Sequence, residues 1–115
     1  MKINKLLSLK SKNSFNSIFN KGSYHKNNNI GVRFYKENEK YYVGYAVSKK
    51  LFNKAVDRNL IKRRMRSEVH KLSNIILKNC FSGSYLFIYL GGDIPSSKSI
   101  STDLLAVTKN FTRDT

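Results

Sequence analysis

Apolar residues in the second half of the chain recur with the spacing of a helix. They follow one another at intervals of three or four positions: Ile61, Met65, Val69, Leu72 and Ile76. At about 100° per residue, these positions form one apolar stripe along an α-helix. We expect the helix to begin after Asn53, whose side chain can cap the first turn, and to end near Asn79. One face of this helix must therefore pack against the rest of the protein.

Shorter patterns of alternation predict strands on both sides of that helix. Apolar residues occupy alternate positions in residues 30–35 and again in residues 41–48, which is the period of a half-buried strand. Residues 85–90 are nearly all apolar, so we expect a central strand that is covered on both faces. The strand at 41–48 has small residues on one face, where another backbone can approach closely: Gly44, Ala46 and Ser48.

The other segments carry weaker patterns. Residues 1–10 are basic, and we expect them to be loose at the start. A short helix is predicted over residues 11–20, and a polar loop over residues 25–29, in which His25 is solvated. A final amphipathic helix is expected from about Thr102, with four apolar residues as its candidate core: Leu104, Leu105, Val107 and Phe111.

Together these elements predict one α+β domain that spans residues 1–115. A chain of this length can bury one modest core. The expected architecture is a single-domain sandwich, in which helices pack on a small mixed β-sheet in the order α-β-β-(β)-α-β-α.

The charge of the chain narrows its function. It has 22 Lys and Arg against 7 Asp and Glu, a formal net charge of +15, which predicts self-repulsion unless a polyanion is bound. Cys80 is the only cysteine, so an internal disulfide and a thiolate zinc site are excluded. We find no signal peptide or membrane-spanning stretch, and therefore expect a soluble, cytoplasmic protein.

The basic residues are most dense at the start of the long helix. Five of the twelve residues in 55–66 are Lys or Arg, and Asp57 is the only acid among them. Lys62, Arg63 and Arg66 project beside the apolar stripe, and Arg58 lies at its edge. Such a helix packs with one face and offers fixed cations with its flank, which suits the phosphates of a nucleic acid.

This stretch resembles the signature of the bacterial ribonuclease P protein subunit, roughly A-V-x-R-N-x-x-K-R-x-x-R. An upstream Ser48-Lys49-Lys50 also agrees with the family, and the resemblance covers about residues 6–90. Two features differ: Leu60 stands where the family usually has a cation, and the loop between Lys50 and Ala55 lacks the usual glycine and is one residue longer. Seven positions of the signature are filled: Ala55, Val56, Arg58, Asn59, Lys62, Arg63 and Arg66.

The resemblance implies a division of labour with RNA. The family's RNA subunit performs the Mg²⁺-assisted cleavage, while the protein binds that RNA and the 5′ leader of precursor tRNA, as a complex of one protein with one RNA. It also implies a left-handed β-α-β crossover. The residues expected to contact the RNA subunit are Arg58, Asn59, Lys62, Arg63, Arg66, Lys49 and Lys50. The residues expected in the leader cleft are Phe15, Phe19, Arg33, Tyr35 and Ser48.

The pattern alone leaves the role of the helix at 11–20 open. Phe15, Ile18 and Phe19 are spaced to share one side of it, where they could be core residues or a platform on which unpaired bases stack. The resemblance favours the second interpretation for Phe15 and Phe19.

The sequence offers no set of residues for hydrolysis by the protein itself. Its acids form no metal-binding pair on one element, and neither histidine has a carboxylate or cysteine partner nearby in sequence. Glu68 is expected to pair with Arg64, one turn earlier. Two alternatives remain: a ribosomal or ribosome-assembly protein that binds structured RNA, and a DNA-binding module that places the basic helix in a major groove.

Overall fold

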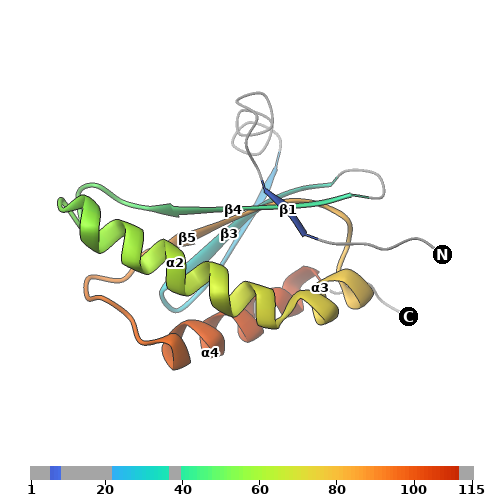
Figure 1. The fold of residues 1–115 in the computed structure, drawn as a ribbon. Helices are drawn as coiled ribbons and strands as arrows, with labels where there is room; N and C mark the ends of the chain where they lie inside the picture. The colour runs from blue at the N-terminus through green and yellow to red at the C-terminus, as the bar shows by residue number, and fades with distance from the viewer. Residues whose placement is uncertain (1–5, 9–21, 37–39, 112–115) are drawn as a thin grey trace.

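The computed structural model describes residues 6–8, 22–36 and 40–111. Within these ranges, five strands form one mixed sheet in the order β1-β4-β5-β3-β2 (Figure 1). β4 is parallel to β1 and β5, and β3 is antiparallel to β5 and β2. The expected α+β fold with one mixed sheet is confirmed. The strands are β1 (Leu6–Ser8), β2 (Ser23–Asn27), β3 (Ile30–Lys36), β4 (Tyr41–Val47) and β5 (Gly83–Tyr89).

The helices in the described ranges lie on one face of this sheet (Figure 1). α2 and α3 connect β4 to its parallel neighbour β5, so the chain contains a β-α-β crossover. None of these helices is long and apolar enough to cross a lipid bilayer. The elements are α2 (Ala55–Lys71), α3 (Ser73–Asn79), α4 (Ser97–Thr108) and the 3-10 turn η1 (Lys109–Phe111).

The apolar stripe of α2 packs against the sheet as its spacing predicts. Ile61, Met65 and Val69 are completely buried, and the stripe continues into α3. The sheet contributes alternate residues of its central strands to the same core, among them Val32, Val43 and Phe87. The predicted helical phase is therefore confirmed.

The predicted long helix is interrupted at Leu72, which separates α2 from α3. Leu72 has φ −92° and ψ 3°, and its backbone N–H donates to the carbonyls of Glu68 and Val69 at 3.2 and 3.0 Å. A shared bond of this kind tightens the last turn and ends an α-helix. Ile76, beyond the break, remains 2% exposed, so the apolar stripe survives it.

Two segments expected to lack regular structure belong to the sheet. Leu6–Ser8 forms β1 beside β4, and the polar loop predicted over residues 25–29 is largely β2 and its turn. Asn28 adopts a left-handed φ of 52°, which allows the tight turn into β3. His25 is not fully solvated, because its ring packs edge-on against Phe111 at 4.9 Å.

The last helix begins earlier than its apolar pattern indicated. α4 starts at Ser97, because the side chain of Ser96 accepts the backbone N–H of Ser99 at 3.1 Å and caps the first turn. Ile100 is buried in the core, whereas Leu105 is 41% exposed. Of the four predicted core residues, Leu105 was therefore assigned wrongly.

At Gly83, both the backbone conformation and the neighbouring strand disfavour any side chain. The φ of this glycine is +151°, and a Cβ added there would meet the carbonyl oxygen of Tyr35 and lie 2.8 Å from a ring carbon of Phe34. We expect Gly83→Ala to lower the free energy of unfolding by on the order of 1–3 kcal/mol, because the added methyl forces strain into the β3–β5 pairing.

The matched control is Gly92→Ala, since a Cβ at Gly92 meets no atom within 4 Å. Urea denaturation of both variants measures the difference. A Gly83→Ala variant as stable as Gly92→Ala would contradict the packing at the start of β5.

Candidate RNA-binding surface

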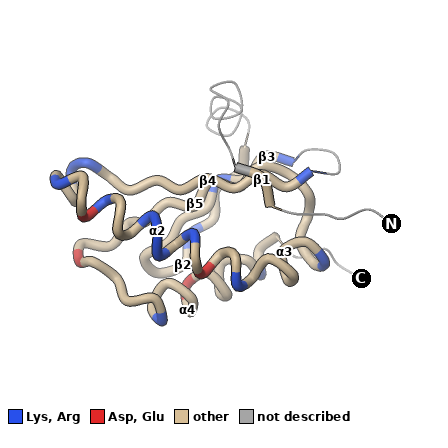
Figure 2. Tube along the Cα trace, viewed as in Figure 1, with Lys and Arg blue, Asp and Glu red and all other residues tan. Residues whose placement is uncertain are grey.

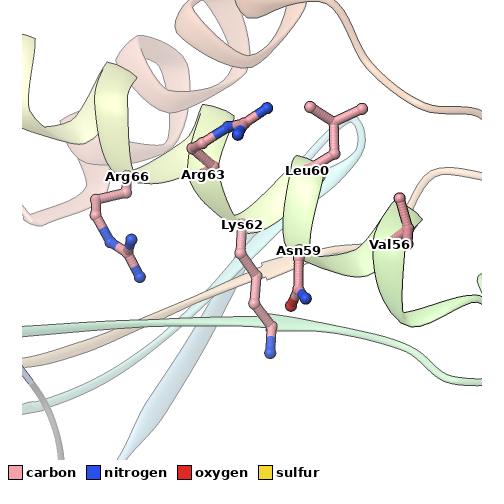
Figure 3. Close-up of a pocket in the computed structure, with 6 residues that line it drawn as sticks. All are labelled: Val56, Asn59, Leu60, Lys62, Arg63 and Arg66. Carbon is pink, nitrogen blue, oxygen red and sulfur yellow. The ribbon is translucent and has the colours of Figure 1, made fainter.

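α2 presents two rows of side chains on its side away from the core (Figure 3). Within each row, residues are three or four positions apart, so their side chains lie one above the other. Together the two rows line a groove of about 550 Å³. The row that extends toward β4 consists of Asn59, Lys62 and Arg66, and the row that extends away from it consists of Val56, Leu60 and Arg63.

The cations of this groove are available to a ligand. Arg63 and Arg66 are exposed and Lys62 is half-buried. Over the described ranges, no hydrogen bond or ion pair neutralises these three side chains. In the other row of the groove, Leu60 is half-buried and Val56 is 77% exposed. The groove therefore combines unpaired positive charge with an apolar strip, an arrangement that can bind phosphate and pack against sugar or base.

The other two arginines of α2 are partly occupied by the protein's own backbone. Arg58 donates from Nη1 to the carbonyl of Phe52 at 2.8 Å, and Arg64 donates from Nη1 to the carbonyl of Pro95 at 2.7 Å. The expected pairing of Arg64 with Glu68 is therefore wrong. Glu68 is 5% exposed and accepts a hydrogen bond from Lys71 at 3.0 Å.

The loop between β4 and α2 holds its shape without a glycine. Ser48 accepts the backbone N–H of Phe52 on its carbonyl at 3.0 Å and that of Lys50 on its hydroxyl at 3.1 Å. Phe52 is 7% exposed and belongs to the core, so it anchors the loop. Lys49 and Lys50 are exposed. Lys54, not Asn53, precedes the first turn of α2, and it makes no side-chain cap.

Arg66 lies over an aromatic ring of the sheet. Its Cζ is 5.7 Å from the centroid of the Tyr45 ring on β4, close enough for a cation–π interaction. Burial raises the pKa of Tyr45 to about 12, while the positive charge of Arg66 acts in the opposite direction. The sequence pattern could not show that Tyr45 meets Arg66, because the two residues are brought together only by packing.

The sheet face opposite the helices carries two of the residues predicted for the leader cleft. Arg33 and Tyr35 alternate with the core residues of β3, so they lie on this face, where Tyr35 packs against the buried Leu86. Arg33 lies over the Tyr24 ring, with its Cζ 5.1 Å from the centroid. Phe15 and Phe19, with the short helix predicted for residues 11–20, lie outside the described residues. Arg33 and Tyr35 thus lie on the sheet face opposite α2, whereas Ser48 lies in the loop with Lys49 and Lys50.

The charged residues are unevenly distributed over the molecule. Figure 2 shows Lys and Arg along α2 and at the loop that precedes it, with Asp and Glu few and scattered. In the part of the chain that the structure describes, no group of three or more His, Cys, Asp and Glu side chains is placed to hold a metal ion. The geometry offers cations and aromatic rings for binding RNA.

The sequence matches the family model described as "Ribonuclease P" over residues 3–110. No curated protein sequence matches the chain.

Solved structures of bacterial ribonuclease P proteins are also similar to this chain. One from Staphylococcus aureus is 28% identical, with a TM-score of 0.72 over 90% of this chain and 93% of that one. A second from the same organism is 26% identical, with a TM-score of 0.73 over 100% and 99%. The protein from Thermotoga maritima is 21% identical and shares the fold, with a TM-score of 0.78 over 92% and 98%.

The family match covers nearly the whole chain, and the fold agrees with that of the similar structures. The most basic helix of the chain, α2, contains the stretch that resembles the family signature. The chain belongs to the ribonuclease P protein family and is the protein subunit of that ribonucleoprotein endoribonuclease.

Proposed function

We propose that this protein binds the RNA subunit of ribonuclease P through α2 and the loop before it. The observation that carries the proposal is the groove on α2, whose three cations are unpaired within the described residues and project from a helix that is anchored by its opposite face. A rigid helix presents its charges at fixed spacing, so it can match the phosphates of a folded RNA. The proposed contacts are Arg58, Asn59, Lys62, Arg63, Arg66, Lys49 and Lys50.

The opposite sheet face is proposed to hold the single-stranded 5′ leader of precursor tRNA. Arg33 and Tyr35 provide a cation and a ring on this face, and the small residues Gly44 and Ala46 belong to the same face on β4, with β5 between the two strands. Bases without a pairing partner stack on aromatic rings whatever their sequence. Phe15, Phe19 and Ser48 complete the proposed cleft, in agreement with the family.

The chemical step is proposed to belong to the RNA. The described surface offers groups that bind and orient RNA, and the family uses Mg²⁺ through its RNA subunit. The protein contributes affinity: it neutralises phosphates of the catalytic RNA and holds the leader, which together favour binding of precursor tRNA over its mature product. Binding of the leader distinguishes this proposal from the alternative of a ribosomal or ribosome-assembly protein, which would not need a cleft for a tRNA leader.

We expect the protein alone to leave precursor tRNA intact. The measurement incubates the pure chain with precursor tRNA and Mg²⁺, with and without a bacterial ribonuclease P RNA, at a low Mg²⁺ concentration at which that RNA alone is slow. Cleavage at the mature 5′ end should appear only when both are present. Correct 5′ cleavage by the protein without RNA would contradict the proposal.

The groove predicts a specific dependence on salt. Arg63→Ala should weaken binding to the RNA subunit and flatten the slope of log affinity against log salt by about 0.7–0.9, the value for one lost phosphate contact. Lys109→Ala is the matched control, because Lys109 is exposed in η1 and outside the groove. Binding titrations at four salt concentrations give both slopes. Equal slopes for the two variants would remove Arg63 from the proposed contacts.

The leader face makes a separate prediction. Tyr35→Leu keeps an apolar side chain against Leu86 but removes the aromatic face, so it should weaken the binding of precursor tRNA by about 1–3 kcal/mol per lost stacked base. Binding of mature tRNA should change little, because it has no leader. Tyr35→Phe, which keeps the ring, should behave as the unmodified protein does. The measurement is a pair of titrations of the reconstituted complex, one with each tRNA, and an unchanged preference in Tyr35→Leu would place the leader elsewhere.

A further inference from the structure

Tyr45 is fixed in place by the core beneath α2. Its ring lies beside that of Phe87, its partner on β5, with centroids 6.0 Å apart and planes 20° apart. Phe87 in turn stacks on Tyr85 at 6.2 Å and 13°. Both of these residues are almost completely buried. The Tyr45 ring is thus the last in a row of three stacked rings, and it has little freedom to move.

The hydroxyl group of Tyr45 makes no favourable interaction within the described ranges. This oxygen is buried, and nothing in the described ranges donates to it or accepts from it. A buried hydroxyl without a partner lowers stability. The favourable contacts of Tyr45 are those of its ring, which meets Phe87 on one side and the guanidinium of Arg66 on another.

This contact separates Arg66 from the other arginines of α2. Arg58 and Arg64 each donate to a backbone carbonyl, and Arg63 is exposed and makes no hydrogen bond or ion pair within the described ranges. Arg66 is held through the face of a ring, and within the described part of the chain none of its N–H groups donates a hydrogen bond. A guanidinium held in this way keeps its planar fork of donors for phosphate.

We propose that Tyr45 is a positioning residue, which holds Arg66 in the orientation that binds a phosphate of the RNA subunit. The inference rests on the proposed function of the groove and extends it to a residue that does not itself touch RNA. Because Arg66 is ordered before RNA arrives, less side-chain freedom is lost on binding than for a freely rotating arginine such as Arg63.

The test is a double-mutant cycle measured with a bacterial ribonuclease P RNA. Tyr45→Leu is compared with the unmodified residue in two backgrounds, Arg66 and Arg66→Gln, with Tyr45→Met as a second replacement should the leucine variant fail to fold. We expect Tyr45→Leu to weaken RNA binding roughly 2–5-fold when Arg66 is present, the range of an exposed cation–π contact. It should have no effect in the Arg66→Gln background.

The control is Tyr45→Phe, which keeps the ring and removes the unpaired hydroxyl. It should bind RNA as tightly as the unmodified protein, with a thermal midpoint at least as high. Equal losses from Tyr45→Leu in both backgrounds would overturn the inference, because Tyr45 would then act through the fold. A loss in Tyr45→Phe as large as in Tyr45→Leu would overturn it as well, since the hydroxyl would be the active group.

The cycle also separates this inference from the proposed function. If Arg66→Gln binds the RNA as tightly as the unmodified protein, Arg66 is no RNA contact, and the positioning role of Tyr45 falls with it, while the other proposed contacts of α2 stay open to the salt test. If Arg66→Gln weakens binding while Tyr45→Leu does not, the RNA contact stands and the positioning role alone is overturned.

Discussion

The packing of α2 on the sheet is the constraint on which the rest of this structure depends. Ile61, Met65 and Val69 are fully removed from water, and burial of each such side chain stabilises the fold by roughly 1.5–3 kcal/mol. Only one rotation of α2 about its own axis buries these three residues. The same contacts therefore fix the direction of every other side chain of α2. The cations at the start of α2 thus gain a defined spacing from the hydrophobic packing beneath them.

That packing also divides the molecule into two surfaces. The helices cover one face of the sheet and carry the basic groove on their outer side, while the other face displays Arg33 and Tyr35. One layer of strands lies between them. A protein built in this way can contact a large structured RNA and a single strand at once, and Tyr45 shows how the sheet itself can shape the groove, since its ring reaches from β4 to Arg66.

The features predicted correctly from the sequence are those encoded by local periodicity. The stripe of α2 and the alternation of β3 and β4 each depend on residues close together in the chain, and the family signature places the cations on the outer flank of the same helix. Predictions failed where distant packing or backbone geometry decided the outcome. Residues 25–29 look polar enough for a loop, yet residues 25–27 pair with β3 in the sheet. The contact of Arg66 with Tyr45 joins residues that are 21 positions apart in sequence.

The central claim is that the RNA subunit covers the groove and the loop before it. Lysine acylation of the protein, free and bound to a bacterial ribonuclease P RNA, measures this directly when each lysine is quantified by mass spectrometry. The account predicts that RNA protects Lys49, Lys50 and Lys62, while Lys109 in η1 reacts at the same rate in both states. Protection of Lys109 with no change at Lys62 would contradict it, because the RNA would then lie on another face of the protein.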